Sequence, residues 1–312
     1  MLSEKVLEQS KATLIALSLQ LAALVPFRVA QWLGRMIGLY NWLLHTRAAQ
    51  VTEVNVTVCL PEMDERARQQ LTKSSLMETG KTMMETASIW MGSIERNLRR
   101  IRKVSGEDIL TEALSQKRGV ILILPHLGNW ELFNLFYGAR GTMTALYQPP
   151  REEALHNLIR KVRNRGGNRM VPPTRKGLAQ LYRTLAQGGV VTILPDQVPA
   201  TGTYANFFGV QALTDMLIPR LVKRTGARVV CVYVKRLTGG TGFEVVFRPS
   251  HPDIDSSDMK VSVNGVNASI EACVREIPEQ YQWEYKRFRE RPKGEPKLYQ
   301  FRKGPPEEMR HQ

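Results

Sequence analysis

The chain has few of the residues on which disulfide frameworks and metal centres depend. Its 312 residues include only three cysteines, Cys59, Cys231 and Cys273, an odd number without metal-ligand spacing. Such sparse use of cysteine is typical of a protein in a reducing compartment. The five histidines are dispersed along the chain. We therefore expect no metal site and no cofactor.

Two common catalytic motifs are also missing. No Gly-x-Ser-x-Gly sequence occurs, so we expect neither the nucleophile elbow of a serine hydrolase nor an acyl-enzyme on serine. Gly80-Lys81-Thr82 resembles the end of a P-loop, but Ser75 stands where that motif requires glycine.

The charge balance indicates an anionic partner but does not choose one. The chain has 44 Lys and Arg residues against 29 Asp and Glu, for a formal net charge of +15. Such a surface favours nucleic acid, an acidic protein or an anionic membrane face. A basic surface that is merely solvated would have the same composition.

The N-terminus has the composition of a membrane-contacting segment. No charge occurs between Lys11 and Arg28, and sixteen helical residues cover roughly 24 Å, less than a bilayer core of about 30 Å. Trp32 and Tyr40 lie among arginines, as at membrane interfaces. We predict a membrane anchor or interfacial helices over residues 1–47, with a pair of ordinary core helices as the alternative.

The anchor leads to an expected location. No signal-peptide pattern is present. If the segment does span, arginines after it outnumber the two lysines before it, which keeps the protein body on the cytoplasmic side. We therefore predict an N-terminally anchored protein on the cytoplasmic face of an inner membrane.

The remainder of the chain predicts an α/β fold. We expect a domain over residues 48–292 and a charged, flexible tail over 293–312. Alternating helices and strands indicate a mainly parallel sheet flanked by helices. Gly239-Gly240 predicts a hairpin between the last two strands. Strands are expected over 119–125, 142–147, 189–195, 227–235 and 242–248, and helices over 64–100, 129–138, 151–164, 175–187, 258–277 and 278–289.

The most informative stretch follows the first of these strands. His126 lies where the apolar run ends, Gly128 allows a turn, and Asn129 can cap the next helix. On a regular helix, residues five positions apart point roughly 140° away from each other, so His126 and Glu131 can meet only through that turn. A carboxylate beside the imidazole would fix its tautomer and make it a usable base. In the alternative, Glu131 only complements the helix dipole.

A second strand ends in a similar way. Pro195-Asp196 echoes Pro125-His126, and parallel strands end at the same edge of a sheet. We therefore expect Asp196 and Gln197 in the cleft that holds His126, although Pro-Asp is also ordinary turn chemistry.

Arginines between residues 160 and 169 form the best candidate anion site. The planar guanidinium matches phosphate geometry. We expect Arg163, and then Arg160, to point inward; the alternative is an exposed helix end with solvated charges.

Taken together, these motifs resemble a known family. His126-Leu127-Gly128-Asn129-Trp130-Glu131 is similar to the HxxxxD/E motif of glycerolipid acyltransferases, and closer still to the bacterial lipid A late acyltransferases (the lauroyl/myristoyl acyltransferase family). The likeness covers nearly the full length. Further segments agree in order: Pro195-Asp196-Gln197, Phe207-Phe208-Gly209-Val210, Gln280-Tyr281-Gln282-Trp283 and Arg287-Phe288-Arg289-Glu290-Arg291-Pro292.

The resemblance implies a glycerolipid-acyltransferase-like fold and an O-acyltransferase. The donor would be acyl carrier protein and the acceptor a hydroxyl of a phosphorylated glycolipid, the lipid A precursor. His126 would be the general base and Glu131 its partner. Backbone amides near Gly128 and Asn129 would stabilise the oxyanion.

The sequence also departs from the family. Tyr147-Gln148-Pro149 stands where a Tyr-Arg-Pro-like segment is expected, and Val198 follows Gln197 where a further acid is common. Both departures concern acceptor recognition.

Three other functions remain open at this point. The first is acyl transfer to another glycolipid or lipid-linked acceptor. The second is a non-catalytic basic protein that binds membrane or nucleic acid, and the third is a thioesterase. Of the possible partners, we do not expect nucleic acid. A non-catalytic basic binding protein would keep its function when His126 is replaced by alanine.

Overall fold

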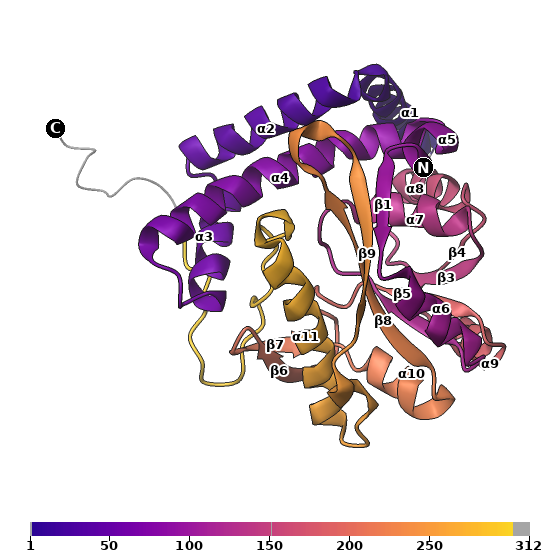
Figure 1. Cartoon of the computed structure of the whole chain (residues 1–312). Helices are drawn as coiled ribbons and strands as arrows, with labels where there is room; N and C mark the ends of the chain where they lie inside the picture. Colours follow the sequence, from indigo (N-terminus) through magenta and orange to yellow (C-terminus); the bar gives the residue numbers. More distant parts are fainter. Residues whose placement is uncertain (1, 151, 302–312) are drawn as a thin grey trace.

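The computed structural model describes residues 2–150 and 152–301. Figure 1 shows helices packed around a central sheet. The helices are α1 (Leu2–Leu24), α2 (Phe27–Leu43), α3 (Arg47–Cys59), α4 (Glu65–Met91), α5 (Ile94–Leu98), α6 (Glu107–Ser115), α7 (Trp130–Gly138), α8 (Glu153–Asn164), α9 (Arg175–Ala186), α10 (Leu217–Thr225) and α11 (Met259–Glu276). The strands are β1 (Ile101–Ser105), β2 (Val120–Ile123), β3 (Met143–Leu146), β4 (Arg169–Val171), β5 (Val190–Ile193), β6 (Thr203–Phe207), β7 (Val210–Thr214), β8 (Arg228–Arg236) and β9 (Phe243–Pro249).

The central sheet is mainly parallel, as predicted. Among the described residues it has seven strands in the order β1-β9-β8-β2-β5-β3-β4. The exception to parallel pairing is the β8–β9 hairpin, whose connection contains Gly239 with a φ of 66°. β6 and β7 form a separate antiparallel pair.

All four residues of β2, in the middle of the sheet, are apolar and buried, because both faces of the sheet are covered there. Ile121 and Ile123 of β2 belong to a core cluster with residues of α9, α10 and α11. Val120 and Leu122 belong to a second cluster with α6 and α7. Strand β2 therefore lies between two hydrophobic layers, and its carboxyl end delivers His126.

The two N-terminal helices lie against α4. Figure 1 shows α2 running alongside α4 at the outside of the fold. Glycines permit this close crossing, because a β-carbon on Gly34 would lie only 2.4 Å from the carbonyl oxygen of Gly80. The outward faces of α1 and α2 carry exposed apolar side chains: Leu14, Leu17, Leu21, Leu24, Val29, Trp32, Tyr40 and Leu43.

No individual helix in the described part of the chain has both the length and the hydropathy of a membrane span. Thr13–Leu24 and α2 meet those criteria only when taken together, and they are bent by 115° with respect to each other. The membrane anchor predicted over residues 1–47 therefore stays a prediction.

One of the predicted helices needs correction. The helix predicted over 278–289 is wrong: a single 3-10 turn, Pro278–Gln280, is followed by irregular chain. That segment instead pairs with the His126 loop through a bridge between Leu127 and Tyr281. Of the predicted tail, residues 302–312 lie outside the described residues.

Candidate functional site

The imidazole of His126 is paired with Asp196. His126 follows β2 and Asp196 follows β5, and these two strands are adjacent and parallel. Nδ1 of His126 lies 2.8 Å from Oδ1 of Asp196, and the backbone N–H of His126 donates to Oδ2 at 2.8 Å. Both carboxylate oxygens therefore fix the same residue. The expectation that Asp196 lies beside His126 is confirmed.

The environment of Asp196 keeps its carboxylate charged. Asp196 is buried. Burial acts to raise the pKa of this carboxyl, but the imidazole and backbone N–H of His126 outweigh burial and hold the pKa below its ordinary value. Burial and the Asp196 carboxylate together raise the pKa of the nearby Tyr281 hydroxyl. Asp196 is thus an ionised acceptor, which favours a proton on Nδ1 and leaves Nε2 of His126 as the basic nitrogen.

Polar side chains lie near Nε2, the second ring nitrogen of His126. The amide nitrogen of Gln197 lies 3.3 Å from Nε2 of His126 and donates to Oε1 of Gln282 at 3.1 Å. Glu284 accepts a hydrogen bond from the Thr79 hydroxyl at 3.0 Å. Burial raises the pKa of Glu284. The Nε2 side of the ring therefore faces an amide donor, with a second carboxyl group nearby.

The expected partnership between His126 and Glu131 is wrong. Glu131 lies on the first turn of α7 and forms an ion pair with Arg163 of α8, with Nε of Arg163 3.2 Å from Oε2. The same oxygen accepts from the Trp90 indole at 3.0 Å. The Arg163 guanidinium on α8 therefore binds the Glu131 carboxylate, and Asp196 lies beside the imidazole instead.

The inward orientation predicted for Arg163 is confirmed, and that of Arg160 is wrong. Arg163 packs over the ring of Tyr147 with its guanidinium carbon 5.1 Å from the ring centre. Arg160 is exposed and bonds to Asn157 of its own helix at 3.2 Å. Residues three positions apart lie on the same side of a helix, so helical periodicity does not distinguish these two; they differ because Glu131 lies opposite Arg163.

The amides of Gly128 and Asn129 are not available to an oxyanion. Gly128 donates its N–H to the backbone carbonyl of Gln280 at 2.9 Å, and Asn129 donates to that of Val234 at 2.8 Å. The Asn129 side chain accepts from the N–H of Leu132, as a helix cap does. The predicted cap is therefore present, but the predicted binding role of these two residues is replaced by a structural one.

Sequence reasoning missed the C-terminal contribution to this site. Gln282 donates its backbone N–H to the His126 carbonyl at 3.1 Å, and Glu284 lies two residues further on. The available signal was the run Gln280-Tyr281-Gln282-Trp283, which interrupts the helical pattern with polar and aromatic residues. No group of three or more potential metal ligands occurs within residues 2–150 and 152–301.

Fold and site together define an α/β protein with an imidazole–carboxylate pair at the carboxyl edge of a parallel sheet. The chain belongs to the bacterial lipid A biosynthesis acyltransferase family, whose sequence model matches residues 3–290. The lipid A biosynthesis lauroyltransferase of Escherichia coli is 28% identical over 284 residues, 90% of this chain and 92% of the relative. The palmitoleoyltransferase of the same organism is 26% identical over 278 residues, covering 88% and 90%. Its myristoyltransferase is 25% identical over 276 residues, covering 86% and 82%.

Proposed function

We propose that this protein transfers a fatty acyl group from acyl carrier protein to a hydroxyl of a lipid A precursor. The family and the names of its relatives support the reaction class. The single observation that carries the mechanism is the His126–Asp196 pair, with Nδ1 2.8 Å from a buried, ionised carboxylate. That pair supplies a general base and no nucleophile of its own, which suits a transferase whose acceptor brings the hydroxyl.

The reaction balances through one proton. Nε2 of His126 takes the proton of the acceptor hydroxyl as its oxygen attacks the thioester carbonyl carbon. The tetrahedral intermediate then collapses, the carbon–sulfur bond breaks, and the imidazolium returns the proton to the departing thiolate. The products are the ester and the free thiol of the carrier protein. Asp196 stabilises the imidazolium between these two steps.

Gln197 is suited to assist that transfer. Its amide N–H group lies beside Nε2, where the acceptor hydroxyl must enter. When the acceptor hydroxyl enters, it takes over the contact that Gln197 makes with Nε2. The freed N–H of Gln197 then donates to the oxyanion. A lost oxyanion donor typically costs about 3 kcal/mol of transition-state stabilisation.

Arg163 is our candidate for holding an acceptor phosphate. Its guanidinium is already fixed by Glu131 and by the ring of Tyr147, so little conformational freedom is lost when an anion binds. Glu131 thus acts through Arg163 rather than through His126.

The exposed apolar side chains of α1 and α2 support docking to the cytoplasmic face of an inner membrane. Trp32 and Tyr40 are 59% and 60% exposed, and several exposed leucines lie on the same two helices. Single exposed apolar residues are ordinary, but apolar exposure gathered in one region marks an interaction site. A hydrophobic face with flanking arginines fits the interface of an anionic membrane, which is where a glycolipid acceptor resides. The net charge of +15 also suits an acidic carrier protein.

Reconstitution tests the proposal directly. Purified protein is given labelled acyl carrier protein and a panel of lipid-linked acceptors that includes a defined lipid A precursor, in mixed micelles. We expect label to move to the lipid A precursor, and His126→Ala to abolish transfer while the circular dichroism spectrum is retained.

Other outcomes would replace the proposal. Transfer only to a different glycolipid would change the acceptor. Hydrolysis of the thioester at the same rate without any acceptor would indicate a thioesterase. Undiminished transfer by His126→Ala would remove the imidazole from the mechanism.

A further inference from the structure

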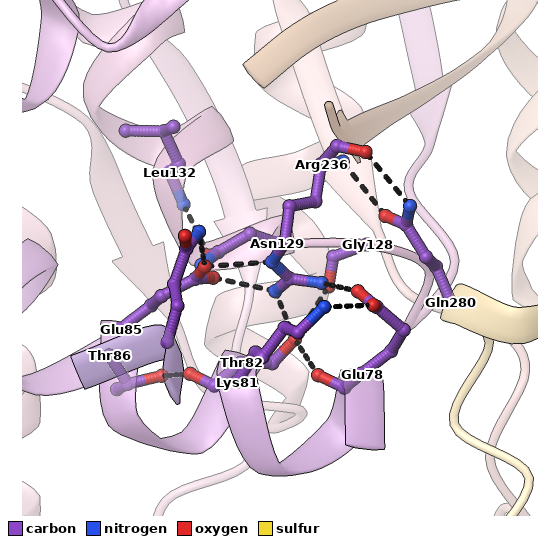
Figure 2. A network of polar contacts seen from close by, with 11 residues as sticks. Glu78, Lys81, Thr82, Glu85, Thr86, Gly128, Asn129, Leu132, Arg236 and Gln280 are labelled. Atoms are coloured by element: carbon purple, nitrogen blue, oxygen red, sulfur yellow. Dashed lines mark hydrogen bonds and ion pairs between the residues drawn. The ribbon is translucent and has the colours of Figure 1, made fainter. Parts of the chain in front are cut away.

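A buried charge cluster lies directly behind the His126 loop. Its centre is the Arg236 guanidinium at the end of β8, which is 3% exposed. Two α4 carboxylates flank it: Glu85 accepts at 2.7 and 2.6 Å, and Glu78 accepts at 2.6 Å (Figure 2). Lys81 forms an ion pair with the outer carboxylate, Glu78. Two positive and two negative side chains are therefore balanced within the cluster.

The cluster contacts the loop at two consecutive residues. The side-chain amide of Asn129 donates to Glu85 at 2.8 Å. The Thr82 hydroxyl accepts from Nη2 of Arg236 at 2.7 Å and has two carbonyl oxygens within donating distance, that of Gly128 at 3.3 Å and that of Glu78 on its own helix at 3.2 Å. One face of α4 thus holds both the turn residue and the helix cap that follow His126.

Gln280 ties the same cluster to the other side of the loop. Its side-chain amide accepts from the Arg236 backbone N–H at 2.8 Å and donates to the Arg236 carbonyl at 2.9 Å (Figure 2). Its own carbonyl accepts the Gly128 N–H. Two residues later, Gln282 bonds to the carbonyl of His126. The backbone of the loop is therefore held from both sides.

The loop has little room to move within this frame. Gly128 has a φ of 64°, and a β-carbon there would lie 1.9 Å from the Val234 carbonyl oxygen. Burying charges for stability alone is inefficient, because apolar residues of similar volume often stabilise a fold as well or better. Fixed geometry is what such a cluster provides, and displacements of about 1 Å at a reacting group can cost about a hundredfold in rate.

We propose that Glu85, Arg236 and Thr82 are positioning residues for His126: they hold the Gly128–Asn129 turn from behind and thereby set the direction of the imidazole toward the acceptor hydroxyl. This inference rests on the proposed acyl transfer, since it assigns a role within that reaction. None of the three side chains needs to touch a substrate. Asp196 fixes the imidazole at Nδ1, and this cluster fixes the backbone that carries it.

The cluster also reaches the hydrophobic helix α2. Gln31 is buried and donates to Oε1 of Glu85 at 2.7 Å. The next residue of the same helix, Trp32, is exposed. A single hydrogen bond therefore links the positioning cluster to the helix that we propose to contact the membrane.

Two matched threonines on α4 test the proposal. Thr82→Val removes the hydroxyl that meets Arg236 and Gly128 while keeping the side-chain shape. Thr86→Val makes the same change one turn later, where the hydroxyl donates to the Thr82 carbonyl of its own helix and, among the described residues, bonds neither to Arg236 nor to the His126 loop (Figure 2). For Thr82→Val we expect kcat to fall between about tenfold and about a hundredfold, with KM for both substrates unchanged. For Thr86→Val we expect kcat within about twofold of the parent protein.

Amide hydrogen exchange provides a readout independent of activity. The segment containing Gly128 and Asn129 should exchange faster in Thr82→Val than in Thr86→Val at equal melting temperature. Arg236→Lys keeps the charge but loses the planar fork, and should show the same faster exchange with lower kcat. Because these variants keep the overall charge of the cluster, they are less disruptive than removal of Glu85.

The outcomes separate the two proposals. Equal exchange and equal kcat in Thr82→Val and Thr86→Val would overturn the positioning role. So would a loss of kcat in Thr82→Val that parallels only the fraction of unfolded protein. If the parent protein transfers no acyl group to any acceptor, the proposed function fails. The catalytic role of the cluster then fails with it, even if the loop exchanges faster in Thr82→Val.

Discussion

Asp196 contacts His126 through both carboxylate oxygens: Oδ1 lies 2.8 Å from Nδ1 of the ring, and Oδ2 lies 2.8 Å from the backbone nitrogen. The pairing depends on the register of β2 and β5, in which Ile123 lies opposite Ile193. Each strand continues through two more residues, a leucine and a proline, before its functional residue. Equal extensions from an aligned pair bring the imidazole and the carboxylate together.

Replacing Asp196 by Asn tests this contact. The amide keeps the size of the carboxylate but can donate to Nδ1, which stabilises the wrong tautomer and removes the charge that balances the imidazolium. We expect kcat to fall by about 10⁴-fold, as in hydrolases with the equivalent change. Acyl-transfer kinetics under single-turnover conditions provide the measurement.

Asp215→Asn is the matched control for that variant. Asp215 accepts the N–H of Leu217 at the start of α10, and asparagine can cap a helix in the same way. It should leave kcat unchanged. Similar losses in both variants would mean that Asp196 acts on stability rather than on His126.

Glu131→Gln and Arg163→Gln separate two roles for the HxxxxE glutamate. Because Glu131 holds Arg163 and not the imidazole, we expect Glu131→Gln to raise KM for the acceptor several-fold and to leave the pH dependence of kcat unchanged. Combined with Arg163→Gln, the effects should be far from additive, since both remove one interaction. A large fall in kcat with a displaced pH profile, and additive behaviour, would return Glu131 to the imidazole.

The sequence predicted five of the seven strands of the described sheet because their signals are local, and it missed the two edge strands β1 and β4. Apolar runs such as 119–125 and 189–195 are bounded by glycine and proline, and each contains the observed strand. Strand direction then brought His126 and Asp196 to one edge. The hairpin at Gly239 followed from turn chemistry. These features need no knowledge of which elements are neighbours in space.

The partners of individual side chains could not be predicted in this way. Whether Glu131 faces His126 or Arg163 depends on how α8 packs against α7, which periodicity does not encode. The amides of Gly128 and Asn129 looked free because nothing local reveals that β8 and Gln280 run alongside. The helix predicted over 278–289 failed for the same reason: tertiary pairing with the His126 loop overrides helix propensity.

Glu284 predicts a measurable pH dependence of stability. Burial raises its pKa above the ordinary value of 4.5, and Thr79, Gln282 and His126 only partly counteract burial. The folded protein therefore binds this proton more tightly than the unfolded chain does. Its contribution to stability is complete below pH 4.5 and is lost as the pH rises through the folded-state pKa.

Glu284→Gln should remove that dependence. Glutamine remains neutral and can still accept from Thr79, so the variant should be more stable than the parent at pH 7.5, with the difference vanishing near pH 4.5. Urea unfolding at a series of pH values measures this difference. Glu290→Gln, an exposed neighbour, should change stability equally little at every pH. A constant difference for Glu284→Gln would show that burial does not set the protonation of this carboxyl.

Charge introduced on the outward face of α2 tests membrane docking. Leu43 is 64% exposed, and Leu43→Glu places a carboxylate where we expect anionic headgroups. Removing one apolar contact and adding like-charge repulsion should weaken binding to vesicles containing anionic lipid by about tenfold or more. The matched control is Val261→Glu, at an exposed apolar residue of α11, 39% accessible, which should leave vesicle binding unchanged. Sedimentation with neutral and with anionic vesicles, at low and at high salt, separates the apolar contribution from the electrostatic one. If both variants sediment like the parent protein, the apolar face of α2 is not the docking surface, and the exposed side chains there need a different partner.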